Sequence, residues 1–347
     1  MGNCSSQSSK SKRKLRNFYL DISIKQFIFV KLVGKGAFGE IWEVIHRSSK
    51  ERLAVKKISK NRVISKKSVA SIVNEMKLLV NLRSSFIVNI RYAFQNAKEL
   101  FLALDFMPGG DLRYQLNNRV TPFTEEEVRF MIACILCGVE YIHSKGVVHR
   151  DIKPENLVFD AFGYLALTDF GISYVDHRDN ASRTSGTLGY MAPEVICGRD
   201  HGNEADFFAI GVICCELTIG TRPYLGKSRG EIREAILASQ AKIEDPSSRI
   251  SSNAIDFINQ MIIRDPRNRL GANGMQEIRD HPWFKEFKWN DLKDRVLRAP
   301  FVPNHGDNFD VKDVDRNWKD HYNSTKVDNK SNVFEGYYYD ERVALGI

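Results

Sequence analysis

The sequence predicts an α+β fold, because strand-like segments lie near its start and helical patterns fill most of the remainder. Between residues 27 and 107, short runs rich in β-branched and aromatic residues recur, which is typical of strands. From residue 124 to about residue 284, apolar residues recur at helical spacing. Strands followed by a long series of helices indicate the α+β class.

Length and composition place the chain among ordinary globular proteins. It has 347 residues, of which 43% are hydrophobic, enough for one large domain or two smaller ones. No apolar run is long enough to predict a transmembrane helix. The six cysteines form no disulfide or zinc framework: Cys134 and Cys137 make a lone C-x-x-C, and Cys214 and Cys215 are adjacent. We therefore expect reduced thiols in a cytosolic protein.

The first 16 residues, MGNCSSQSSKSKRKLR, predict a disordered, lipidated and basic tail. Gly2 and Ser6 fit the M-G-x-x-x-[ST] myristoylation pattern, and Cys4 is placed to carry a palmitate. Five residues of this tail are basic and none is acidic, in a chain of net charge +8. This concentration of charge favours an anionic membrane surface over nucleic acid as the partner. The alternative is a Ser- and Lys-rich tail in which Gly2 is accidental.

A glycine-rich turn follows the first strand-like segment, residues 27–33. It reads GKGAFGEI over residues 34–41, and its glycines let the backbone close over phosphate groups. The same pattern occurs in dinucleotide-binding turns, where a helix comes next. Here residues 41–45 are β-branched and aromatic, which favours a second strand. The candidate phosphate-binding residues are Gly34, Lys35, Gly36, Ala37, Phe38, Gly39 and Ile41.

Lys56 and Glu75 form a candidate pair. Lys56 ends a strand-like run at residues 53–56, and Glu75 lies in a helical pattern between residues 69 and 79. A carboxylate on that helix can hold the lysine towards bound phosphates. Without such a pairing, Lys56 is a strand-edge lysine and Glu75 a solvated helix residue.

Two aspartates mark residues 148–171, which read VHRDIKPENLVFDAFGYLALTDFG. Asp151 and Asp169 flank two strand-like runs joined by a turn at residues 160–163. Such a hairpin brings both carboxylates to one cleft. Phosphoryl transfer needs a carboxylate that accepts a hydroxyl proton, and a carboxylate with an amide that hold Mg²⁺. Asn156 supplies the amide.

As a set, these motifs resemble the catalytic core of eukaryotic protein kinases, over roughly residues 24–310. The resemblance implies the bilobal protein kinase fold, with a small β-rich N-lobe at residues 17–105 and a larger helical C-lobe at residues 106–286. It also implies ATP as the phosphate donor and Mg²⁺ as the cofactor.

The same resemblance implies a role for each site residue. Asp151 would orient the substrate hydroxyl and accept its proton, while Lys153 would neutralise charge on the moving phosphoryl group. Asn156 and Asp169 would hold Mg²⁺. Besides the glycine-rich turn, the residues that would surround ATP are Ala54, Lys56 with its partner Glu75, the gatekeeper Leu104, Asp105, Met107, Asp111 and Glu155.

Segments beyond the core are similar to the AGC group, which includes the cyclic-AMP-dependent kinase. APFVP at residues 299–303 and NFD at residues 308–310 match the C-terminal tail of that group. In the group this tail wraps over the N-lobe, and its F-D element contributes to the nucleotide site. GDLRYQL at residues 110–116 is similar to the YANK branch.

The tail, residues 287–347, ends in the aromatic motif FEGYYY. Many AGC kinases end in F-x-x-F-[ST]-[FY], whose aromatics dock on the N-lobe. Phe334 and Tyr337 take the aromatic places here, and Tyr338 takes the Ser/Thr place. Docking would hold Glu75 in its active position. The alternative is a disordered tyrosine-rich terminus.

The activation segment, residues 172–191, departs from the AGC pattern. The expected phosphosite position holds Arg183, which has no hydroxyl. We predict that Ser182 or Thr184 serves instead, with Arg150 as the cation that would bind the phosphate.

The sequence therefore predicts a monomeric serine/threonine protein kinase on the cytoplasmic face of the plasma membrane, with a cytosolic pool. Lys153, two places after Asp151, favours Ser/Thr over Tyr substrates. Asp111, Glu155 and Glu216 align with acids that bind basic side chains in AGC relatives, so an upstream substrate arginine is expected. The other interpretation makes these acids members of structural pairs. Alternative functions are a membrane-anchored pseudokinase scaffold and a small-molecule kinase.

Overall fold

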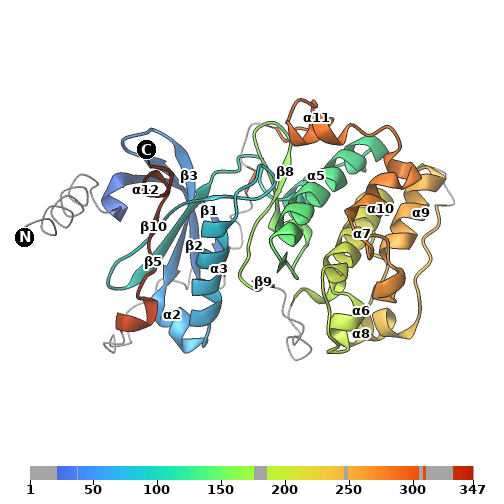
Figure 1. Ribbon diagram of the computed structural model, residues 1–347, viewed down its shortest axis with the longest axis horizontal. Coiled ribbons are helices and arrows are strands. Elements are labelled where there is room, and N and C mark those ends of the chain that lie inside the picture. The colour runs from blue at the N-terminus through green and yellow to red at the C-terminus, as the bar shows by residue number, and fades with distance from the viewer. Residues whose placement is uncertain are drawn as a thin grey trace, which may run out of the picture.

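The protein is described by a computed structural model that covers residues 22–36, 38–175, 186–245, 249–304, 308–309 and 331–346. These residues form two lobes, one built on a β-sheet and the other on helices (Figure 1). The predicted α+β class and bilobal arrangement are confirmed.

The N-lobe is a six-stranded sheet in the order β1-β2-β3-β5-β4-β10. Every neighbouring pair of strands is antiparallel. The strand predicted to reach residue 107 ends at Asp105, where the chain turns towards the C-lobe. The strands are β1 (Phe27–Gly36), β2 (Gly39–His46), β3 (Arg52–Ser59), β4 (Ile90–Gln95), β5 (Glu99–Asp105) and β10 (Tyr339–Asp340).

The glycine-rich turn joins β1 to β2, so a strand follows it, as predicted. Gly36 and Gly39 face each other across this turn. A Cβ atom on Gly39 would come within 1.7 Å of the Lys57 carbonyl oxygen on β3. Only glycine therefore lets β2 lie this close to β3 at the start of the pair.

Two helices follow β3: α2 (Lys60–Ser65) and α3 (Val69–Asn81). The apolar residues of α3 that recur at helical spacing face the core, where Ile72, Met76 and Leu79 are buried. This confirms the predicted helix between residues 69 and 79. The same buried face carries Glu75.

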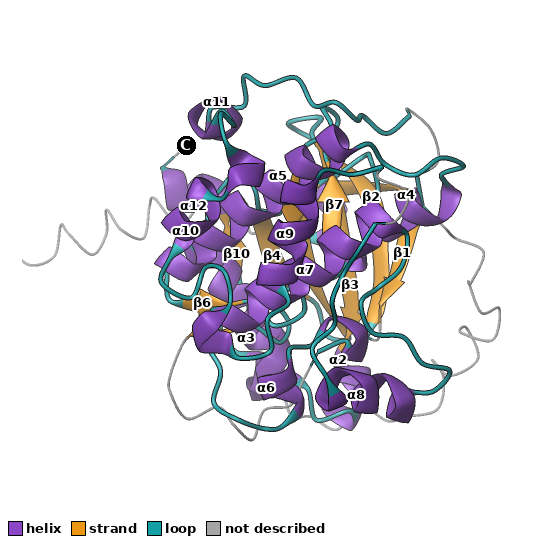
Figure 2. Ribbon diagram, turned by 90° about the vertical axis from the view of Figure 1, so that its right-hand side faces the viewer, coloured by secondary structure: helices purple, strands orange, loops and turns teal. Residues whose placement is uncertain are grey.

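The C-lobe is predominantly helical, and helix α7 lies at its centre. Seen from the C-lobe end in Figure 2, α7 lies in the middle with α5 and α9 around it. The longer helices are α5 (Glu125–Ser144), α7 (Glu204–Ile219), α8 (Arg229–Ala238) and α9 (Ser252–Met261). The shorter ones are α4 (Leu112–Asn118), α6 (Pro193–Ile196), α10 (Met275–Asp280) and α11 (Trp289–Lys293).

Local sequence explains where α5 and α7 begin and end. The Thr124 hydroxyl and the Glu127 side chain form a capping box at the start of α5, which the T-x-x-E spacing in the sequence also indicates. The apolar residues of α7 go almost all the way round it, and nearly all of its residues are buried, as expected for a core helix. It ends at Gly220, whose φ of 88° is a left-handed cap conformation that favours glycine.

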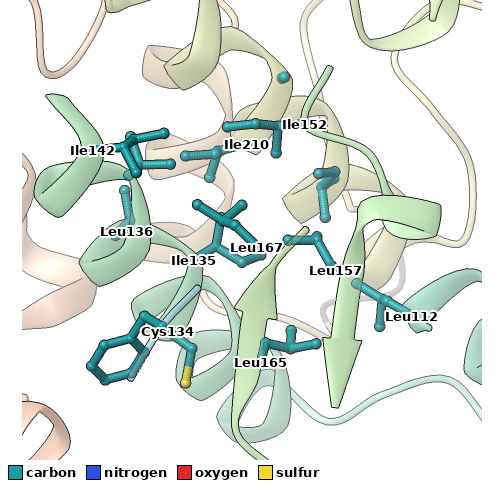
Figure 3. Close-up of a cluster of buried hydrophobic side chains, with 14 of the residues drawn as sticks. Leu112, Cys134, Ile135, Leu136, Ile142, Ile152, Leu157, Leu165, Leu167 and Ile210 are labelled. Atoms are coloured by element: carbon teal, nitrogen blue, oxygen red, sulfur yellow. The ribbon is translucent and has the colours of Figure 1, made fainter. Parts of the chain in front are cut away.

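A β-hairpin lies on α5 at the edge of the C-lobe core. Its strands are β7 (Leu157–Phe159) and β8 (Leu165–Leu167), and the Asp160 side chain accepts backbone hydrogen bonds within the turn. Side chains of both strands pack with those of α5 in one buried cluster (Figure 3). The predicted hairpin is therefore present, and it is fixed to the core. A second short pair, β6 (Val147–Val148) with β9 (Tyr174–Val175), flanks it.

The end of the chain returns to the N-lobe, where it is drawn in red in Figure 1. Strand β10 pairs with β4, and α12 (Glu341–Leu345) follows it. Phe334 and Tyr337, just before β10, are both buried. The predicted docking of the two aromatics is confirmed, and the disordered-terminus alternative does not hold for residues 331–346.

The described cysteines are all free thiols, and four of the five are buried. None of the described helices combines the length and apolarity that crossing a bilayer requires.

Candidate active site

A cavity of about 680 Å³ lies between the lobes, bordered by the glycine-rich turn, β3, α3, the segment after β5 and the hairpin region. Every predicted catalytic, metal-binding and nucleotide-binding residue that the structure describes borders it. Ala37 lies outside the described residues. Residues of the strands, of α3, of the inter-lobe hinge after β5 and of the loops are thus brought to one place. They span more than 130 positions in the sequence.

Lys56 on β3 meets Glu75 on α3 at the back of the cavity. The lysine Nζ lies 2.8 and 3.2 Å from the two Glu75 carboxylate oxygens, and 3.8 Å from Asp169 Oδ1. Burial disfavours the ammonium, but the two carboxylates outweigh it and raise the pKa of Lys56 above its ordinary value. The predicted pair is confirmed. The alternative, in which Lys56 is a strand-edge lysine and Glu75 a solvated helix residue, does not hold.

Helix α3 is also tied to the segment after Asp169. The Ser71 hydroxyl donates to the Gly171 carbonyl, and the Asn74 amide donates to the Ser173 carbonyl at 3.0 Å. These contacts fix the rotation of α3, and so keep Glu75 directed at Lys56.

The Asp151 carboxylate is held from both sides. Its Oδ2 accepts from Lys153 Nζ at 2.7 Å and from Asn156 Nδ2 at 3.2 Å. Its Oδ1 accepts from the backbone N–H and the hydroxyl of Thr187, at 3.0 and 2.8 Å. Lys153 also donates to the Thr187 hydroxyl at 2.8 Å. Sequence reasoning missed this role of Thr187, whose signal was only its place beside Gly186, in a Gly-Thr pair near the end of the activation segment.

Buried Asp206, at the start of α7, fixes the loop before Asp151. Its carboxylate accepts the backbone N–H groups of His149 and Arg150 at 2.9 and 2.8 Å, and it lies 2.8 Å from His143 Nε2. Burial alone would raise the pKa of Asp206, but these neighbours hold it below its ordinary value. The Arg150 φ of 71° is unusual for a residue with a side chain, and the Asp206 bonds hold this conformation. The sequence gives no signal for this anchoring role.

Asp169 and Asn156 have donor atoms that suit Mg²⁺. The nearby Lys56 ammonium lowers the pKa of Asp169, so its carboxylate is ionised at neutral pH. Its side chain is 50% exposed, towards the cavity. The described residues contain no group of three or more His, Cys, Asp or Glu side chains that could hold a metal ion by themselves. Mg²⁺ in protein sites binds one or two carboxylates and takes its other ligands from phosphate oxygens and water.

The C-terminal tail contributes to the other end of the cavity. Phe309, in the predicted F-D element, borders it and lies 6.0 Å from the Phe106 ring, between centroids. The Asn308 amide donates to the carbonyl of Pro108 in the hinge at 3.0 Å. Phe309 therefore lies at the cavity, as the resemblance implied for the F-D element. Asp310 lies outside the described residues.

The three acids predicted to bind a substrate arginine are already engaged within the chain. Arg113, in the first turn of α4, pairs with Glu155 and with Glu216 at 3.1 and 3.0 Å. Asp111 accepts the Tyr114 N–H at 2.8 Å as the N-cap of α4. The structural-pair interpretation therefore holds for Glu155 and Glu216. Sequence reasoning missed Arg113.

The predicted lipidation sites, Gly2 and Cys4, and the phosphosite candidates, Ser182 and Thr184, all lie outside the described residues.

Comparisons with known proteins agree with this geometry. The protein kinase domain family matches residues 27–284. A probable serine/threonine-protein kinase of Dictyostelium discoideum is 39% identical, over 85% of this chain and 64% of its own length. Serine/threonine-protein kinase AtPK2/AtPK19 of Arabidopsis thaliana is 32% identical, over 97% of this chain and 72% of its own. Human ribosomal protein S6 kinase alpha-3 is 38% identical, over 81% of this chain and 38% of its own.

The chain spans less than two thirds of the length of the first and third of these relatives. The family match covers both lobes and every catalytic residue from the glycine-rich turn to Asp169. Protein kinases use ATP and Mg²⁺, for which the cavity has suitable groups. This chain therefore belongs to the protein kinase domain family, and its relatives are serine/threonine kinases that include AGC members.

Proposed function

We propose that this chain transfers the γ-phosphate of ATP to Ser and Thr hydroxyls of protein substrates. The observation that carries this proposal is the convergence of Asp151, Lys153, Asn156 and Asp169 on one cavity, with the Lys56–Glu75 pair formed at 2.8 Å. No group that the reaction needs is missing from this set.

ATP with Mg²⁺ supplies the transferable phosphoryl group and the cation that neutralises its charge. Asp151 accepts the proton of the substrate hydroxyl. Its two oxygens already take four hydrogen bonds from Lys153, Asn156 and Thr187, which orient the carboxylate for this task. Lys153, next to Asp151, neutralises charge on the moving phosphoryl group, and Lys56 orients the phosphates of ATP.

A pseudokinase scaffold would require the loss of a catalytic group, and none is lost. A small-molecule kinase is the second alternative.

The test is to incubate the protein with radiolabelled ATP, a degenerate peptide library and a mixture of small hydroxylated metabolites. We expect label in Ser- and Thr-containing peptides. Label confined to small molecules, or none despite ATP binding, would contradict the proposal.

The N-terminal tail is proposed to anchor the kinase to an anionic membrane surface. One myristoyl chain binds a bilayer with a constant of only roughly 10⁴ M⁻¹, so stable attachment needs a second signal. A palmitate on Cys4 and the five basic residues of the tail provide two. We further propose that the protein is a monomer with a cytosolic pool, and that Ser182 or Thr184 is the regulatory phosphosite.

Gly2→Ala is expected to move the protein from the membrane fraction to the soluble fraction, because it removes the acylation site. Cys4→Ser should weaken attachment without abolishing it. Cell fractionation followed by immunoblotting measures both, with Ser9→Ala as a control in the same tail. A Gly2→Ala protein that fractionates like the wild type would show that the anchor proposal is wrong.

We propose that the docked C-terminal segment supports activity. The Gln95 amide donates to the Phe334 carbonyl at 2.9 Å, and Glu341 pairs with Arg83 and Arg91 at 2.8 and 2.7 Å. Tyr337 packs into the same core as α3 and lies near Glu75. The turn Ser331–Phe334 lies against α3, and the docked segment thereby restrains this helix, which must stay in place for the Lys56–Glu75 pair to form.

Phe334→Ala combined with Tyr337→Ala is expected to lower both kinase activity and thermal stability. The two changes remove the rings that attach the segment to the N-lobe, and Phe→Ala at such buried sites costs about 3–5 kcal/mol unless the segment detaches. Kinase assays and melting curves would be compared with those of a chain truncated after Asn332. Tyr338→Ala is the matched control, because this neighbouring ring is 47% exposed. Wild-type activity and melting in both altered proteins would rule out the supporting role.

A further inference from the structure

The guanidinium of Arg113 is enclosed by an acidic cluster, formed by Glu155, Glu216 and Tyr190. Nε donates to Glu155 Oε1 at 3.1 Å, while Nη1 and Nη2 donate to the two Glu216 oxygens at 3.0 and 3.2 Å. Nη2 also donates to the Tyr190 hydroxyl, which in turn donates to Glu216 Oε2 at 2.6 Å. The side chains of Arg113 and Glu216 are only 26% and 13% exposed. This is the two-point geometry that arginine adopts with a carboxylate.

The cluster lies beside the place where a protein substrate must approach. Glu155 borders the same cavity as Asp151. Tyr190 follows Thr187 by three positions in a 3-10 turn, and Thr187 bonds directly to Asp151. A peptide whose hydroxyl reaches Asp151 therefore passes close to these side chains.

Without Arg113, the cluster would be a receptor for an arginine. Two carboxylates and a tyrosine hydroxyl would surround a site of charge −2, with no cation to balance it. Arg113 brings the charge to −1, and the Arg222 guanidinium, 5.6 Å from the centre of the Tyr190 ring, adds a further cation nearby.

We propose that Arg113 is a specificity-determining residue, which occupies this acidic site within the chain and prevents the kinase from selecting an arginine there in its peptide substrates. The inference rests on the proposed kinase activity. A substrate arginine would have to displace a side chain that is already tethered next to the two carboxylates, and tethering gives Arg113 a high effective concentration. The expected substrates therefore carry no arginine at the position that contacts Glu155 and Glu216. This revises the expectation of an upstream arginine drawn from the three acids.

The test compares serine peptides that carry a single arginine at successive positions before the acceptor with an otherwise identical alanine peptide. For each enzyme, the measured quantity is the kcat/KM for the arginine peptide divided by that for the alanine peptide. The wild type should show a ratio within about threefold of one at the position served by the cluster. Arg113→Ala should raise the ratio there by about tenfold or more, because hydrogen bonds to a charged group are stronger than neutral ones.

Three further variants make the result specific. Arg113→Ala with Glu216→Gln should lose the gained selection, since one of the two carboxylates is then neutral. Arg119→Ala is the matched control, because Arg119 follows the same helix but pairs with Glu127 at 2.9 Å, outside the cluster. Its ratio should equal that of the wild type. If Arg113→Ala fails to fold, Arg113→Gln provides the same comparison without the charge.

The outcomes separate this inference from the proposed function. If the wild type phosphorylates no peptide, the proposed function fails and the inference fails with it. If it phosphorylates the alanine peptide, the proposed function stands. The inference is then overturned in either of two cases. In the first, the Arg113 variants show the wild-type ratios. In the second, the wild type already has a kcat/KM ratio of about ten or more at the position that contacts Glu216.

Discussion

Asp151→Asn and Asp169→Asn are each expected to lower turnover by about 10²-fold or more, the effect typical of removing a preorganised electrostatic group from an active site. An asparagine at position 151 keeps the size of the side chain but cannot accept the proton of the substrate hydroxyl. At position 169, the change removes the charge that attracts Mg²⁺ and that lies 3.8 Å from Lys56. Phosphate transfer to a peptide, measured under single-turnover and steady-state conditions, gives the loss of turnover in each variant.

The two variants should differ in one respect. Asp151→Asn leaves the nucleotide end of the cavity intact, so it should bind ATP with Mg²⁺ as the wild type does. Asp169→Asn should need a higher Mg²⁺ concentration for the same ATP affinity. Asp294→Asn, a change of the same kind at an exposed position after α11, is the control for solubility and expression. Near-normal turnover in both site variants would refute the assignment of these two residues.

Arg269→Leu is expected to destabilise the protein by about 3–5 kcal/mol, because it leaves the buried Glu194 carboxylate without its counter-charge. Arg269 pairs with both Glu194 oxygens, at 2.7 and 3.0 Å, and both side chains are almost fully buried. The guanidinium also donates to the Glu204 and Ile263 carbonyls, at 2.6 and 2.9 Å. It therefore joins α6, the start of α7 and the segment before α10.

Urea unfolding, followed by intrinsic fluorescence, measures this loss as a lower midpoint. Arg267→Ala is the matched control: this arginine, two positions earlier, makes an exposed pair with Asp265, so its midpoint should stay near that of the wild type. Adding Glu194→Leu to Arg269→Leu should recover part of the loss, because a buried pair replaced by apolar side chains leaves no unpaired charge. An unchanged midpoint in Arg269→Leu would mean that the pair does not hold this part of the C-lobe.

The parts of the fold that could be predicted from the sequence are those with local signals. The helical spacing of apolar residues located α3, and the Thr124–Glu127 capping box located the start of α5. The turn residues after β7 located the hairpin that brings Asp151 and Asp169 together. Each of these signals lies within a few residues of the structure that it produces, because helix caps, turns and periodicity act over short separations.

The parts that were missed join residues far apart in the chain. Thr187 reaches Asp151 across 36 positions, Asp206 bonds the loop backbone across 56 and 57, and Arg113 reaches Glu216 across 103. Thr187 belongs to a Gly-Thr pair and Arg113 to the GDLRYQL segment, but nothing in these short motifs indicates the distant partner. Their partners are decided only when the C-lobe helices pack around the hairpin.

The sequence by itself determined the family, the two lobes and the identity of the groups that act on ATP, because their motifs combine residue type with short fixed spacings. Only the tertiary structure decided how those groups are held and which of them are free for a substrate. The acids Glu155 and Glu216 show the difference: the sequence indicates two carboxylates near the active site. In the folded chain, α4 packs against the turn that carries Glu155, and Arg113 lies between this acid and Glu216 on α7. Charge pairing depends on distances of a few ångströms between distant residues, and those distances exist only in the folded chain.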